Sequence, residues 1–164
     1  MFQRLYVLAL INFVLLTVSS VAWAASPIDP ILQAKSAPPG VVFEIVTGKN
    51  DSLDWALPQV KSYIDQIHQR FPDIHIAVVT HGREMFALAK RQQSETNSPV
   101  HQLSKELVQD GVSLHVCGTY AERKGLNAED FPEYVNVAAE GPAQVKDYRS
   151  MGYVLVKITR PATK

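Results

Sequence analysis

The apolar positions of this chain change period repeatedly, from runs typical of buried strands to stripes typical of helices. Val41 to Val46 is a short apolar run rich in β-branched residues, as expected of a strand buried on both faces. From Leu53 to Phe71, apolar residues recur every three or four positions, which predicts an amphipathic helix. A proline is tolerated only in the first turn of a helix, so Pro58 suggests that this helix properly begins near Leu57.

The same alternation continues to the end of the chain. Two helices are predicted, over Val100 to Val108 and from about Pro142 to Met151. Four further strands are predicted at Ile74 to Thr80, Val112 to Val116, Tyr134 to Ala138 and Tyr153 to Ile158. Strands that alternate with helices through short links form right-handed βαβ units. We therefore predict an α/β domain whose five-stranded, mostly parallel sheet is covered on both faces.

The N-terminus changes where this domain is expected to work. Residues 1–24 predict a cleavable signal peptide: Arg4 precedes an apolar stretch, and Ala22 and Ala24 supply small residues at positions −3 and −1. Cleavage near Ala24 makes the mature protein periplasmic or secreted. The alternative is an uncleaved anchor, because Leu5 to Ala24 approaches the roughly 20 residues that span a bilayer. A membrane partner is expected only in that case.

The rest of the chain divides into a leader and one domain. Residues 25–40 are rich in proline, alanine and serine, lack periodicity and predict a leader or tether. Residues 41–164 then form the single α/β domain. The formal net charge is +0, and no basic patch or arginine-rich run is evident. This charge balance argues against nucleic acid as a partner.

Composition narrows the chemistry to one thiol. Cys117 is the single cysteine, so no disulfide can form within the chain. A lone thiol in an exported protein is buried and inert, paired with a cysteine of another chain, or a reactive group that takes part in the protein's chemistry. No Cys/His spacing indicates a zinc site, and no metal is expected. No phosphate-cradling loop, dinucleotide fingerprint or Ser-His-Asp pattern is present, so no cofactor is expected either.

Ligands in open parallel sheets bind beyond the carboxyl ends of the strands. Cys117 lies at such an end, where backbone N–H groups and a helix dipole favour the thiolate, and Gly118 allows a tight turn. His115, two residues earlier, is expected to share its face with Cys117, and His81 follows the second strand. The structural alternatives are that Cys117 is a small buried hydrophobe, that His115 is a satisfied core histidine and that His81 caps a local turn.

Several segments together resemble the DsrE/DsrF-like sulfur-relay family: Val41 to Val46, Val78 to Gly82, Val116 to Leu126, Val135 to Ala138 and Met151 to Val154. The resemblance implies a three-layer α/β/α fold with a five-stranded parallel sheet, assembled into homo-oligomers. It also implies that Cys117 carries sulfur as a persulfide, between a donor and an acceptor thiol that the sequence does not identify. His81, His115, Gly118 and Thr119 are the candidate supporting residues.

These observations lead to an exported sulfur-binding or sulfur-transfer protein as the predicted function. Whether it acts as a sulfurtransferase or only as a carrier stays open. A first alternative is a non-catalytic module that binds a small ligand or a protein in the same strand-end crevice. A second is a structural subunit of a homo-oligomer, with the thiol buried.

Overall fold

The computed structural model describes residues 25–93 and 98–160, so the predicted signal peptide lies outside the described residues. Its sheet has five strands in the order β4-β3-β2-β1-β5, and every neighbouring pair is parallel. The strands are β1 (Gly40–Ile45), β2 (His75–Thr80), β3 (Ser113–Cys117), β4 (Asn136–Ala138) and β5 (Val154–Ile158). The predicted five-stranded parallel sheet is confirmed, with β4 shorter than expected.

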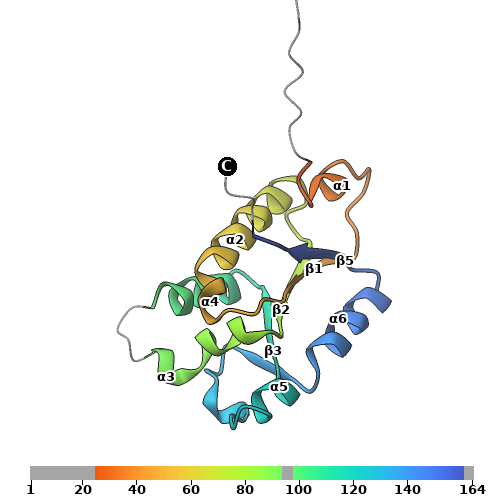
Figure 1. Ribbon diagram of the computed structural model, residues 1–164. Coiled ribbons are helices and arrows are strands. Elements are labelled where there is room, and N and C mark those ends of the chain that lie inside the picture. The colour runs from red at the N-terminus through yellow and green to blue at the C-terminus, as the bar shows by residue number, and fades with distance from the viewer. Residues whose placement is uncertain (1–24, 94–97, 161–164) are drawn as a thin grey trace, which may run out of the picture.

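Helices cover both faces of this sheet (Figure 1). The α-helices are α1 (Asp29–Leu32), α2 (Leu53–Arg70), α3 (Lys90–Gln93), α4 (Pro99–Gln109), α5 (Gly118–Glu122) and α6 (Gly141–Ser150). Short 3-10 helices form at η1 (Asn50–Ser52), η2 (Arg83–Leu88) and η3 (Ala128–Asp130). Since α2 and α4 lie on one side of the sheet and α6 on the other, the three-layer α/β/α fold is confirmed.

The core has one cluster on each face of the sheet. The larger joins the strands to α2 and α4 and includes the buried side chains of Phe43, Ile64 and Leu114. The smaller lies under α6 and consists of Val42, Ala77, Val79 and Val145. Burial on both faces explains why β1 and β2 have few polar residues. The polar residues that the two strands do carry are therefore informative about the site.

The structure differs from the sequence interpretation at the start of α2. The helix begins at Leu53 rather than near Leu57, and Pro58 lies inside it. A proline there removes one backbone hydrogen bond. Leu53, Ala56 and Leu57 are all buried in the larger core cluster. Burial of these side chains offsets the lost bond and keeps the first turn helical.

Part of the predicted leader belongs to the domain. Ile28 is 0% exposed and Ile31 3% exposed, and both pack into the larger core cluster at α1. The side chain of Asp29 accepts a hydrogen bond from the backbone N–H of Ser26 at 2.8 Å. Prolines 27 and 30 concealed this short turn in the sequence because they break the helical period. Among the described residues, no helix has the length and apolar character to cross a membrane.

Candidate functional site

The carboxyl end of β3 opens onto a cleft that contains the thiol. Cys117 is the last residue of β3 and the N-cap of α5. The cleft has a volume of about 260 Å³ and is lined by His81, Cys117, Thr119, Tyr120, Arg123, Glu140 and Pro142. Cys117 itself is only 6% exposed, so its side chain lies at the floor of this opening. We call this opening the cysteine cleft.

The turn after the cysteine is tied to the neighbouring strand. The backbone N–H and the hydroxyl of Thr119 both donate to the carbonyl of Ala139, at 3.0 Å and 2.8 Å. A Cβ added at Gly118 would lie 3.1 Å from the carbonyl oxygen of Ala138. Gly118 therefore permits the close approach of α5 to β4. Thr119 lines the cleft, but its amide is directed at a carbonyl rather than at the thiol.

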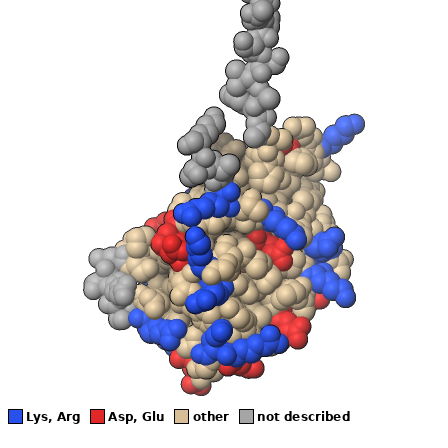
Figure 2. Space-filling view, in the orientation of Figure 1, with Lys and Arg blue, Asp and Glu red and all other residues tan. Residues whose placement is uncertain are grey.

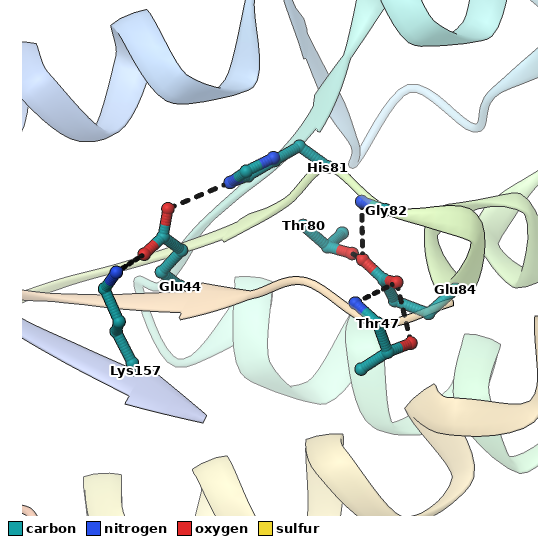
Figure 3. A network of polar contacts seen from close by, with 7 residues as sticks. All are labelled: Glu44, Thr47, Thr80, His81, Gly82, Glu84 and Lys157. Carbon is teal, nitrogen blue, oxygen red and sulfur yellow. Dashed lines mark hydrogen bonds and ion pairs between the residues drawn. The ribbon is translucent and has the colours of Figure 1, made fainter. Parts of the chain in front are cut away.

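His81 is the predicted histidine that does reach the cysteine cleft. Its Nε2 lies 3.0 Å from a carboxylate oxygen of Glu44, and the other oxygen of Glu44 lies 3.6 Å from Nζ of Lys157 (Figure 3). The side chains of His81 and Glu44 are 13% and 14% exposed. A Cβ added at Gly141 would lie 2.3 Å from Cβ of His81, so the glycine at the start of α6 makes room for this ring. Sequence reasoning missed Glu44, whose signal was its place as the one charged residue in an apolar strand.

His115 is not among the residues that line the cysteine cleft. Its Nε2 lies 2.8 Å from the hydroxyl of Tyr148 on α6, and the two rings meet edge to face. Desolvation by burial lowers the pKa of His115 and raises that of Tyr148. These contacts favour the structural alternative, a satisfied core histidine.

A second buried histidine lies outside the cleft, at the base of α4. His101 is 3% exposed and contacts the hydroxyl of Tyr134 through Nδ1. Desolvation, with a smaller contribution from Lys105, lowers the pKa of His101, and burial raises the pKa of Tyr134 to about 12. Both histidines therefore resist protonation in the folded protein.

This resistance predicts a loss of stability in mild acid. A lowered pKa in the folded state means that the unfolded chain binds protons more readily. The resulting contribution to the free energy of unfolding is fully present above the ordinary histidine pKa of about 6.5. It is lost as the pH falls through the lowered pKa values that the two histidines have in the folded state. Urea unfolding between about pH 8 and 5 should show the free energy of unfolding falling, and the double variant His101→Asn, His115→Asn should show a weaker slope. An unchanged slope in that variant would assign the effect to other groups.

A buried carboxylate holds the ends of β1 and β2 together beside the cleft. Glu84 is 0% exposed, and each of its oxygens accepts two hydrogen bonds (Figure 3). One oxygen accepts from the backbone N–H and the hydroxyl of Thr47, both at 2.8 Å. The other accepts from the hydroxyl of Thr80 at 2.7 Å and the N–H of Gly82 at 2.8 Å. Glu84 is thus fully satisfied and fixes the loop that begins with His81.

No group of three or more His, Cys, Asp or Glu side chains within residues 25–93 and 98–160 is placed to hold a metal ion. The cysteine cleft presents a thiol, an imidazole, two hydroxyls, a guanidinium and a carboxylate. That set suits nucleophilic chemistry at sulfur, with a nearby proton acceptor and a cation.

The fold and this cleft define a class: a three-layer α/β/α domain with a lone cysteine at the carboxyl end of a parallel strand. The protein-family model of the DsrE/DsrF-like family matches residues 45–158. The chain belongs to the DsrE/DsrF-like family, and the predicted resemblance is confirmed. A comparison with curated proteins found no match.

Solved structures agree on the fold. A protein of unknown function from Methanobacterium thermoautotrophicum aligns with a TM-score of 0.59 and 19% identity, over 72% of this chain and 97% of its own. The ychN protein from E. coli gives a TM-score of 0.56 and 10% identity, over 73% and 99%. A conserved protein of unknown function from Bacteroides thetaiotaomicron gives 0.50 and 16%, over 71% and 94%. At these identities the likeness establishes the fold alone.

Proposed function

We propose that this protein is an exported sulfur carrier or sulfurtransferase that holds sulfane sulfur as a persulfide on Cys117. The observation that carries the proposal is the thiol at the floor of an open, strand-end cleft, beside an imidazole and a guanidinium. Membership of the DsrE/DsrF-like family supports it, because it indicates a sulfur-relay type of fold. The predicted signal peptide, cleaved near Ala24, is the basis for export to the periplasm or the medium.

The transfer step needs no external oxidant. The Cys117 thiolate attacks the terminal sulfur of a donor R–S–SH, the new S–S bond forms, and R–S⁻ leaves, which gives Cys117–S–SH. An acceptor thiolate then attacks that outer sulfur and releases the Cys117 thiolate. His81 is placed to take the thiol proton before the first attack, while Glu44 holds its ring through Nε2. The donor and the acceptor thiol are unassigned, and assembly into a homo-oligomer is part of the same proposal.

The low exposure of Cys117 is the observation that favours the structural alternative. It does not exclude transfer, because a persulfide donor presents a single sulfur atom and Cys117 lines a cleft of about 260 Å³. A buried structural thiol would instead be closed to reagents of every size. The two hypotheses therefore differ in a property that can be measured.

Reagent size should strongly affect labelling of the folded protein. Methyl methanethiosulfonate, which is small, is expected to modify Cys117 at least about tenfold faster than a maleimide on a polyethylene glycol chain, a difference of about 1.4 kcal/mol in activation free energy. The matched control is the unfolded protein in urea, where that ratio should fall towards its value for a small free thiol. Equal, very slow labelling by both reagents in the folded state would support the structural alternative.

Intact-protein mass spectrometry tests the function itself. The mature protein is exposed to inorganic polysulfide and measured with and without reductant. A reductant-reversible gain of one or more sulfur atoms, mapped to Cys117 and absent in Cys117→Ser, is the expected result. If the thiol reacts with methyl methanethiosulfonate but gains no sulfur, the proposal fails and the binding-module alternative takes its place.

A further inference from the structure

We propose that a second cleft, next to the cysteine cleft, binds the carboxylates of a small organic persulfide, so that the donor is a carboxylate-bearing thiol compound rather than an inorganic sulfur species. The inference rests on the proposed function. The second cleft has a volume of about 240 Å³ and is lined by Asn50, Arg83, Phe86, Arg91 and Lys124. Three cations, an amide and an aromatic ring make up this set, and we call it the cation cleft.

The charge of the cation cleft is not neutralised around Arg83 and Lys124. Neither side chain forms an ion pair with a carboxylate anywhere in the described residues. Arg91 has further contacts, and the adjoining cleft that shares it also contains Asp51 and Asp54. The argument therefore depends on Arg83 and Lys124. Guanidinium and ammonium groups are the usual protein ligands for carboxylates.

The two clefts share a wall. Tyr120 lines the cysteine cleft and Phe86 the cation cleft, and their ring centroids are 5.4 Å apart. Lys124 Nζ lies 6.0 Å from the Tyr120 ring, and the preceding residue, Arg123, lines the cysteine cleft. On the face that Figure 2 shows, Lys and Arg side chains are spread over the domain, with Asp and Glu side chains among them. A chain of cationic positions thus leads from one cleft to the other.

The separation between the thiol and the cation cleft indicates which class of sulfur donor can contact both. Thiosulfate or a short polysulfide carries its charge next to the reacting sulfur and would meet only Arg123, with Glu140 opposing it in the same cleft. To contact Arg83 and Lys124 as well, a donor needs an anionic group that lies across the Phe86–Tyr120 wall from the thiol. A thiol peptide with free carboxylates meets that requirement, and its peptide backbone would cross the aromatic rings. Sulfur transfer then follows the step given above, with the peptide thiolate leaving.

Binding can be tested apart from transfer. S-methylglutathione carries the carboxylates but no reactive sulfur, and its dissociation constant for the full mature protein is measured by calorimetry. The double variant Arg83→Gln, Lys124→Gln is expected to weaken binding about tenfold, or about 1.4 kcal/mol, because it removes two partly exposed ion pairs with the carboxylates. The matched control is Arg70→Gln, Arg149→Gln, two exposed cations outside both clefts. Equal binding by the two double variants, or binding of the diethyl ester as tight as that of the acid, would overturn the inference.

Kinetics separate this inference from the proposed function. With glutathione persulfide as donor, the cation-cleft variant is expected to show a KM raised about tenfold and a nearly unchanged maximal rate, whereas its loading by inorganic polysulfide should match the unmodified protein. If polysulfide loads Cys117 but the KM for glutathione persulfide is the same in the variant and the unmodified protein, the proposed subsite is wrong and the proposed function stands. If no donor loads Cys117 while S-methylglutathione still binds through Arg83 and Lys124, the function fails and the subsite stands.

Discussion

Replacing Glu84 with glutamine is expected to lower the free energy of unfolding by about 3 kcal/mol. Each carboxylate oxygen of Glu84 accepts two hydrogen bonds in a site with no solvent exposure. An amide nitrogen cannot accept, so whichever oxygen it replaces, two donors lose their acceptor and face another donor. A threonine hydroxyl can rotate away, but a backbone N–H cannot. Hydrogen bonds to a charged group contribute about 1.5–3 kcal/mol each, and an unsatisfied buried group costs about as much.

Urea unfolding of Glu84→Gln measures this loss, and thermal unfolding should show Tm lowered by roughly 10 °C for a domain of this size. Glu106→Gln is the matched control because Glu106 is exposed on α4, where such a change stays within about 0.5 kcal/mol. A loss below about 1 kcal/mol for Glu84→Gln would show that the carboxylate does not hold the two strand ends together.

The same carboxylate illustrates which parts of the site could not be predicted from the sequence. Glu84 contacts Thr47 across 37 residues of chain, and Glu44 contacts His81 across the same separation. Only the parallel pairing of β1 with β2 brings these positions together. In the sequence, Glu84 is one polar residue after a strand, and Glu44 interrupts an apolar run without a visible partner. Buried charges of this kind are recognised only when their donors are known.

The elements themselves were predictable for a physical reason. Strands buried on both faces, such as β1, must be continuously apolar, and a helix over one face must be apolar every three or four residues. Those patterns located the five strands, and the predicted end of the third strand, Val116, is one residue before the end of β3 at Cys117. The pattern did not reveal α1, because Ile28 and Ile31 are only two buried residues in a proline-rich stretch.

The distribution of charge over the surface was the property least predictable from the sequence. The formal net charge is +0, and the sequence shows no basic run. The structure nevertheless brings Arg83, Arg91 and Lys124 together in the lining of one cleft at the carboxyl edge of the sheet. Arg83 lies in η2 and Arg91 in α3, both between β2 and α4, whereas Lys124 follows α5. A surface of this kind forms through topology and leaves no local trace in the chain.

Among the candidate site residues, the two histidines are distinguished by their contacts in the structure. In the sequence, His115 was expected to share a face with Cys117 and His81 followed the second strand, and both were candidate supporting residues. The structure places His81 on the wall of the cysteine cleft and ties His115 to Tyr148 under α6. The proposed proton acceptor is therefore His81, and this choice has a kinetic consequence.

Replacing His81 with glutamine is expected to slow polysulfide loading of Cys117 by about 100-fold near neutral pH, the lower end of the range for loss of a general base. Glutamine can still donate a hydrogen bond to Glu44 from its amide, so the pair at 3.0 Å is replaced rather than left open. It cannot take the thiol proton. At alkaline pH, where hydroxide removes that proton, the rates of the variant and the unmodified protein are expected to converge.

The rate of loading is followed by mass spectrometry across the pH range, with thermal unfolding to check the fold. His75→Gln is the matched control, because His75 is exposed at the opposite end of β2 and should leave the profile unchanged. A purely structural His81 would lower the rate by the same factor at every pH, or lower Tm without changing the rate of the folded fraction. Convergence at high pH is therefore the result that identifies His81 as the group that takes the proton from Cys117.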